Sequence, residues 1–181
     1  MTTRLRDVFH MEVDMEGLKQ LKKNIQSLNS NHIEWGILNQ EQYPADDRKG
    51  RAGVYVAEVA KDNEFGFMFS NQKGETHETP PRPFFTQSIL VNGKFVAQSS
   101  TNLLLSKLPT ISIPELKLGM QMLAEKLADT VREEIDSQDF VPNSPETLKR
   151  KEGDQILKDS DVMYHSFTGK VVRGKVPLGD S

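Results

Sequence analysis

The side chains best suited to chemistry are spread along the chain without the spacing that chemistry requires. The chain has four histidines and none has ligand spacing to another: His10, His32, His77 and His165. Acidic pairs such as Asp46 and Asp47 lie in polar stretches, where nothing would drive the two carboxyl pKa values apart. The chain has no cysteine, which excludes a thiolate nucleophile and a disulfide. The sequence therefore predicts a protein that is not an enzyme and uses no metal or cofactor.

A basic loop is the one candidate for phosphate contact. Its cations are Arg48, Lys49 and Arg51, and two glycines separate them from a possible helix. The segment lacks the spacing of a P-loop or a dinucleotide fingerprint. The formal net charge of −3 also argues against a protein that coats nucleic acid. A DNA-binding adaptor that uses these three residues and Arg82 stays open as an alternative.

Two further segments have unusual composition. Asn63-Glu64-Phe65-Gly66 places an acid and an aromatic at the end of a short predicted helix, which Gly66 stops. Pro80–Phe85 is a stiff run with three prolines that ends in two phenylalanines. The run either inserts Phe84 and Phe85 into the core or sets the angle of a subunit contact. The candidates for such a contact are Glu64, Phe65, Pro81, Arg82, Pro83, Phe84 and Phe85. We also expect Arg82 to pair with Glu64.

Hydrophobic periodicity predicts the elements that must position these segments. Leu18, Leu21, Ile25 and Leu28 follow helical spacing and predict a helix over 16–30. Alternation over 32–38, with Trp35 on the apolar face, predicts a strand. Residues 54–60 fit a strand or a helix, and their alanines favour the helix. Residues 39–53 and 66–83 are predicted to be long loops.

The second half of the chain is predicted to contain the longest helix. Apolar residues from Leu116 to Ile135 keep helical spacing, and Pro114 suits the first turn of this helix over about 114–139. Asn92-Gly93 predicts a hairpin within the uncertain insert 86–113. Ser144 is expected to cap a short helix to about residue 151. A short helix over about 159–166 and a closing strand over 167–172 follow.

The organisation is that of one domain over 1–172 with a polar tail over 173–181. Hydrophobic residues make up 36% of the chain, which is low for a domain that buries all its elements alone. No apolar run reaches the roughly 18 residues of a membrane helix, and the first residues do not fit a secretory signal. We therefore expect a protein made in the cytoplasm that makes no contact with a membrane.

The chain resembles a family of tailed-phage virion morphogenesis proteins, which includes tail-completion, neck and head–tail joining proteins of long-tailed phages. A first block of the resemblance consists of Val56–Ala60, Asn63–Gly66 and Pro80–Phe85. A second block runs from Pro142–Lys151 through Gly153, Asp154 and Leu157–Asp159 to Met163, Ser166, Phe167 and Val171. Where members carry Thr-Gly, this chain has Ser160 and Asp161, which suggests a capped helix start. The resemblance covers roughly residues 30 to 172.

The resemblance implies an α+β fold, with a small mixed or antiparallel sheet packed with one long helix and several short ones. It also implies a non-catalytic virion protein that forms a ring, commonly six-fold, in the neck or at the head-proximal end of the tail. Its partners would be copies of itself, the connector and the tail tube or sheath. Any contact with DNA in the channel would be passive. Tail completion, tail termination and head closure remain equally open.

Overall fold

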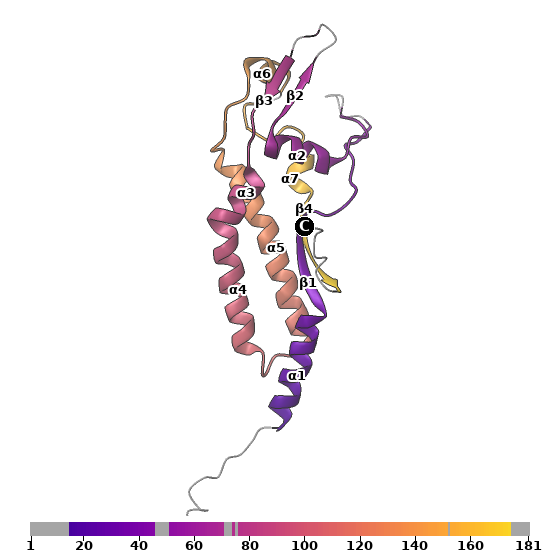
Figure 1. The fold of residues 1–181 in the computed structure, drawn as a ribbon, viewed down its shortest axis with the longest axis vertical. Coiled ribbons are helices and arrows are strands. Elements are labelled where there is room, and N and C mark those ends of the chain that lie inside the picture. The colour runs from indigo at the N-terminus through magenta and orange to yellow at the C-terminus, as the bar shows by residue number, and fades with distance from the viewer. Residues whose placement is uncertain (1–14, 46–50, 71–73, 75, 152, 175–181) are drawn as a thin grey trace, which may run out of the picture.

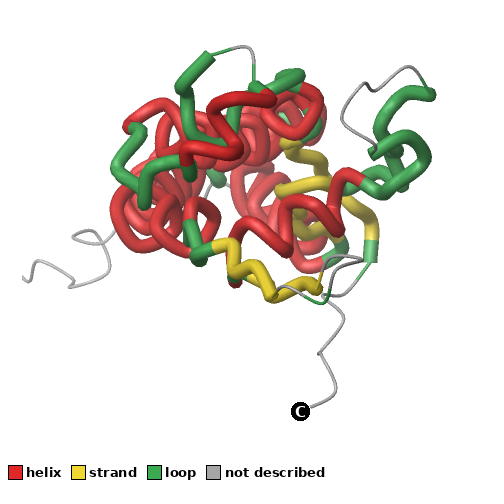
Figure 2. Tube along the Cα trace, turned by 90° about the horizontal axis from the view of Figure 1, so that it is seen from above, coloured by secondary structure: helices red, strands yellow, loops and turns green. Residues whose placement is uncertain are grey.

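A computed structural model describes residues 15–45, 51–70, 74, 76–151 and 153–174 of the 181-residue chain. The fold is α+β: helices dominate, and the strands form two small antiparallel pairs. The molecule is elongated, with the helices α4 and α5 side by side along its length (Figure 1). Seen from above, the helices gather on one side of the strands (Figure 2).

The long helix α5, Ile113–Ser137, is the central element. Ser112 and Glu115 form a capping box, with the Glu115 carboxylate accepting from the Ser112 N–H at 3.0 Å, and Pro114 lies in the first turn. The predicted apolar face is confirmed: Leu116, Met120, Leu123, Leu127, Val131 and Ile135 are all buried. The acidic residue Glu134 is also buried on this helix. Burial raises the pKa of the Glu134 carboxyl.

One face of α5 is covered by a two-stranded sheet. The strands are β1, Asn31–Ile37, and β4, Phe167–Arg173, which pair in antiparallel register with Trp35 opposite Gly169. A Cβ at Gly169 would lie 2.0 Å from the Ala124 carbonyl oxygen, so this position needs glycine for β4 to approach α5. The predicted strands are confirmed, and Trp35 is half-buried against the core.

The N-terminal helix α1, Met15–Asn29, leads directly into β1 and is confirmed. Its buried residue is Asn24, whose amide donates to the carbonyl oxygens of Leu108 and Ile111 at 2.7 Å each. Leu18 and Ile25, two members of the apolar stripe, are exposed. A polar contact with the α4–α5 connection therefore fixes this helix, and part of its apolar stripe faces solvent.

The segment 84–107 is helical throughout, so the predicted hairpin at Asn92-Gly93 is wrong. Helix α3, Phe84–Ser88, continues through a π-helical turn, Ile89–Gly93, into α4, Lys94–Lys107, with helical backbone at both joints. Gly93 is buried inside this run rather than placed at a turn. We call α3, the π-turn and α4 together the helical arm, residues 84–107.

The upper end of the molecule holds the remaining elements (Figure 1). Helix α2, Val56–Phe65, is confirmed. The prediction of a loop throughout 66–83 is wrong in part, because this segment contains an antiparallel pair of strands, β2, Phe67–Ser70, with β3, Thr76–Thr79. Helix α6, Pro145–Arg150, has the predicted Ser144 cap, whose hydroxyl accepts from the Thr147 N–H at 3.2 Å. Helix α7, Val162–His165, follows Asp161, but the Asp161 side chain forms no cap hydrogen bond.

The core lies where these upper elements meet the sheet and the end of α5. It is a single cluster: Tyr43, Val56, Ala60, Phe84, Val131, Ile135, Met163 and Phe167. Phe84 and Phe167 form an edge-to-face pair with ring centroids 5.7 Å apart. The core thus joins the helical arm to the sheet at one end only.

Candidate functional site

The residues of the first sequence block meet in one place, which we call the motif junction. It comprises Glu64, Arg82 and Phe84, and all three side chains are buried. Glu64 comes from the last turn of α2, Arg82 from the extended proline run, and Phe84 from the first residue of α3. Each makes a different internal contact, so the junction can be followed one side chain at a time.

Glu64 caps the helical arm from another element. Its carboxylate accepts from the backbone N–H of Phe85 at 2.8 Å and of Thr86 at 3.0 Å. These are the second and third residues of α3, whose N–H groups have no partner within the helix. Pro83 at the N-cap position supplies no side-chain acceptor. Glu64 therefore does the work of an N-cap and places a negative charge at the positive end of the helix dipole.

Arg82 ties the first sequence block to the second. Its Nε donates to the Val141 carbonyl at 3.1 Å, and its Nη2 donates to the Pro142 carbonyl at 3.4 Å and to Asn143 Oδ1 at 3.2 Å. Burial lowers the pKa of the guanidinium. The two blocks that carry the resemblance are thus in direct contact through this one side chain.

The expected ion pair between Glu64 and Arg82 is wrong. The Glu64 carboxylate binds backbone N–H groups of α3, whereas the Arg82 guanidinium binds acceptors of the connection after α5. The backbone links the two residues instead, because the Arg82 N–H donates to the Asn63 carbonyl at 2.8 Å. The proline run directs the two side chains to opposite partners.

The remaining contact candidates divide by exposure. Pro83 and Phe85 are half-buried, Pro81 is exposed, and Phe65 is 70% exposed. Gly66 turns the chain directly after Phe65, with a φ of +71°, and a Cβ there would lie 2.7 Å from the Thr79 carbonyl oxygen. Of the seven candidates, Phe65 and Pro81 are therefore the most available to another chain.

A pocket of about 340 Å³ opens beside the junction. Its walls are mostly apolar and come from β1, α2 and α3, and they include Trp35, Phe65, Phe84 and Phe85. The indole N–H of Trp35 is the buried side-chain polar group with no hydrogen-bond partner among the described residues. The polar lining consists of Lys61, Glu64 and Thr86. Because the Glu64 carboxylate already accepts two N–H groups, the pocket offers shape rather than catalytic chemistry.

The basic loop lies only partly within the described residues. Arg48 and Lys49 lie outside the described residues. Arg51 forms an ion pair with Asp159 at 3.2 Å, and its guanidinium carbon lies 4.3 Å from the centre of the Tyr43 ring. The positive charge of Arg51 is therefore directed at its own chain, as is that of Arg82.

Several exposed apolar residues lie on the helical arm, which sequence analysis did not single out. Helix α4 has no buried residue over its 14 residues. Phe95 is 74% exposed and Leu103 is 58% exposed. Leu103 also lines a groove of about 450 Å³ between α4 and α5 that includes Leu118 and Met122. The sequence held one signal of this surface: residues 80–114 contain no Asp or Glu.

The described residues contain no group of three or more His, Asp or Glu side chains that could hold a metal ion. His32 contacts the Gly174 carbonyl at 3.0 Å and Glu34 at 3.1 Å, and these contacts raise the pKa of its imidazole. Within the same part of the chain, no helix is long and apolar enough to cross a membrane.

Comparison with protein-family models, with curated proteins and with solved structures finds no match.

Proposed function

We propose that this protein is a non-enzymatic structural subunit of a tailed-phage virion. It forms a ring in the neck or at the head-proximal end of the tail and joins tail to head. The observation that carries the assembly role is the helical arm, whose α4 segment buries none of its residues. The resemblance in the two sequence blocks supports the virion role.

The exposure of the arm is hard to reconcile with an isolated chain. Leu90, Val91, Phe95, Leu103 and Leu105 are each at least half exposed. Apolar side chains exposed in this number on one element are typical of a protein–protein contact. In water α4 has little packing to hold it, because helices in proteins gain most of their stability from a buried face.

A second copy of the chain is the partner that the charges favour. The acid-free stretch 80–114 carries three basic residues: Arg82, Lys94 and Lys107. Lys94 and Lys107 are exposed on the arm, so two arms packed against each other would bring like charges together. On α5 the carboxylates Asp129 and Glu133 pair with Arg132 and Lys126 of the same helix, and Glu125 is exposed. A contact between the arm of one copy and these carboxylates of the next would be heterologous, and such contacts form a ring when the rotation between copies closes.

The motif junction supports the resemblance from a different direction. Arg82 joins the two blocks in space, so their order and composition serve one local structure. Asp161 has a φ of +55°, in the left-handed region that glycine adopts without strain. This is the position where the resembling proteins carry the Gly of Thr-Gly. The departure from their pattern is thus a substitution that keeps the same backbone turn.

Light scattering over a concentration series, with negative-stain imaging of the same samples, tests the proposal. We expect rings of fixed subunit number, or a monomer that forms rings when tail tubes are added. The variant Phe95→Gln should weaken assembly, whereas Leu148→Gln, which changes an exposed apolar residue of α6, should not. A monomer that stays unchanged with tails and heads would overturn the proposal.

A further inference from the structure

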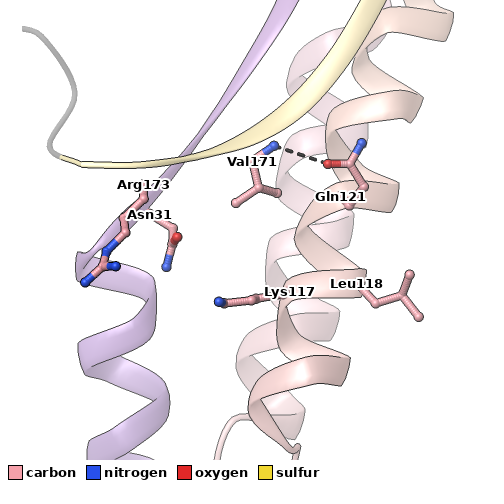
Figure 3. Close-up of a pocket in the computed structure, with 6 residues that line it drawn as sticks. All are labelled: Asn31, Lys117, Leu118, Gln121, Val171 and Arg173. Atoms are coloured by element: carbon pink, nitrogen blue, oxygen red, sulfur yellow. Dashed lines mark hydrogen bonds between the residues drawn. The ribbon is translucent and has the colours of Figure 1, made fainter.

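A second pocket lies at the lower end of the sheet, away from the motif junction. It has a volume of about 440 Å³ and lies between the start of β1, the first half of α5 and the end of β4 (Figure 3). Its lining residues are Asn31, Lys117, Leu118, Gln121, Val171 and Arg173. Two of the six are cations and none is an acid. The pocket is therefore locally positive in a protein whose formal net charge is −3.

Neither cation has a partner within the described part of the chain. No ion pair or side-chain hydrogen bond joins Lys117 or Arg173 to a described residue. The other arginine side chains that the structure describes all have internal acceptors or ion pairs: Arg51, Arg82 and Arg132. Arg173 is thus an exposed arginine whose five side-chain N–H donors have no acceptor among the described residues.

The two cations belong to separate elements that line the same pocket. Lys117 extends from α5 toward α1, and Arg173 extends from the end of β4 beside Asn31 (Figure 3). Asn31 and Arg173 are paired residues of the sheet, and the Gly174 N–H donates to the Ser30 carbonyl at 3.0 Å. Both cations are therefore carried by regular structure rather than by a loop.

Gln121, another lining residue, joins α5 to β4 through its side chain. Its side-chain amide donates to the Gly169 carbonyl at 2.9 Å, and its side-chain oxygen accepts from the Val171 N–H at 3.2 Å. The side chain thereby pairs with the outer edge of β4 in the way that a further strand would. This contact holds β4, which carries Arg173, against α5, which carries Lys117.

We propose that this pocket, which we call the cation pocket, binds a phosphate group. A dibasic phosphate carries close to two negative charges at neutral pH, which matches the two cations. The planar guanidinium can donate two parallel hydrogen bonds to phosphate oxygens, and the lysine adds a point charge. The phosphate is either free or part of a DNA backbone, because a phosphodiester, with a single negative charge, still presents two non-bridging oxygens to the same donors.

The proposal does not depend on assembly, because all six lining residues belong to one chain. It also places phosphate contact at a different position from the basic loop around Arg51. The Arg51 and Arg82 cations already have internal partners, whereas those of the cation pocket have none among the residues that the structure describes. Failure of the ring proposal would therefore leave this site untouched, and the reverse also holds.

Titration of the full chain with inorganic phosphate, followed by amide chemical shifts at constant ionic strength, tests the site directly. We expect saturable shifts at Asn31, Gln121 and Val171. The double variant Lys117→Gln with Arg173→Gln should bind phosphate about tenfold more weakly or worse, since charge-assisted hydrogen bonds are lost. The control Lys94→Gln with Lys107→Gln removes the same charge from the arm and should leave binding unchanged. Unfolding curves confirm that both variants fold.

A labelled DNA duplex distinguishes the source of the phosphate. If the DNA backbone is the ligand, anisotropy titrations should show duplex binding. The slope of the logarithm of the binding constant against the logarithm of the salt concentration should then fall in magnitude by about 0.9 for each cation removed. Saturable phosphate shifts without duplex binding would assign the pocket to a free phosphate. Absence of both signals, or equal losses in the pocket variant and the arm variant, would overturn the proposal.

Discussion

The motif junction and the helical arm are neighbours in the chain but opposite in character. At the junction, Glu64, Arg82 and Phe84 are buried, and the Glu64 carboxylate and the Arg82 guanidinium both have internal partners. Along the arm, α4 buries no residue and leaves Phe95 and Leu103 to solvent. The residues of the motif junction, which form the most distinctive sequence motif, therefore stabilise the monomer. The helical arm, which exposes apolar side chains, carries no comparable motif.

This difference changes what the proline run is for. Its two phenylalanines were expected either to enter the core or to set the angle of a subunit contact. Phe84 enters the core, and the Glu64 cap aligns the first turn of the arm. The run thus sets the direction in which the arm leaves the body. Under the proposed function, an internal joint would orient an external contact surface.

The largest expected effect is at the centre of the junction. Phe84→Ala should lower the free energy of unfolding by about 4 kcal/mol, because a fully buried aromatic leaves a cavity against Phe167. Urea denaturation measures this loss. The matched control is Phe65→Ala, whose side chain is mostly exposed and should change stability by less than about 0.5 kcal/mol. Equal losses in the two variants would contradict the assignment of Phe84 to the core.

The next effect in size concerns the link between the two sequence blocks. Arg82→Met keeps most of the aliphatic stem but leaves the Val141 and Pro142 carbonyls and Asn143 without their donor. We expect a loss of about 2–3 kcal/mol in the free energy of unfolding. Arg173→Met, which changes an exposed arginine, is the control for thermal unfolding. A variant as stable as the wild type would show that the link is dispensable.

A smaller effect is expected from the cap of the arm. Glu64→Gln retains one acceptor oxygen but removes the charge at the helix N-terminus, so we expect a loss of about 1 kcal/mol. Amide hydrogen exchange should localise the change to residues 84–93. Glu58→Gln alters an exposed carboxylate of the same helix α2 and should leave exchange in the arm unchanged. Uniform acceleration over the whole chain would mean that the cap stabilises the fold rather than the arm.

Changes in the groove between α4 and α5 should have the smallest effect on the free energy of unfolding and the largest effect on self-association. Leu103→Gln with Met122→Gln changes two exposed residues of the groove between α4 and α5. Unfolding of the monomer should change by less than about 0.5 kcal/mol, while sedimentation velocity should show weaker self-association. A stability loss like that of Phe84→Ala would mean that the groove is part of the core, and the comparison between the two regions would fail.

Elements with long regular patterns were predictable from the sequence. The apolar spacing of α5, the alternation of β1 and the Ser144 cap of α6 each depend on residues close together in the chain. The local signal failed at Asn92-Gly93, where a turn dipeptide lies inside a helical run. The helical run begins at Phe84, where Glu64 caps its first turn and the Phe84 side chain packs in the core. Neither contact can be inferred from the residues around Gly93.

The candidate sites divide in the same way. The sequence identified Glu64, Arg82 and Phe84 as a group, but it predicted the wrong pairing between Glu64 and Arg82. It gave no reason to join Lys117 with Arg173, which are 56 residues apart and line one pocket because β4 lies against α5. Residue types and short spacings thus determined α1, α2, α5 and α6 and the strands β1 and β4, but not the helical arm or the strands β2 and β3. The tertiary structure alone decided which polar groups are satisfied internally and which surfaces are left for a partner, because those contacts join residues that are distant in the chain.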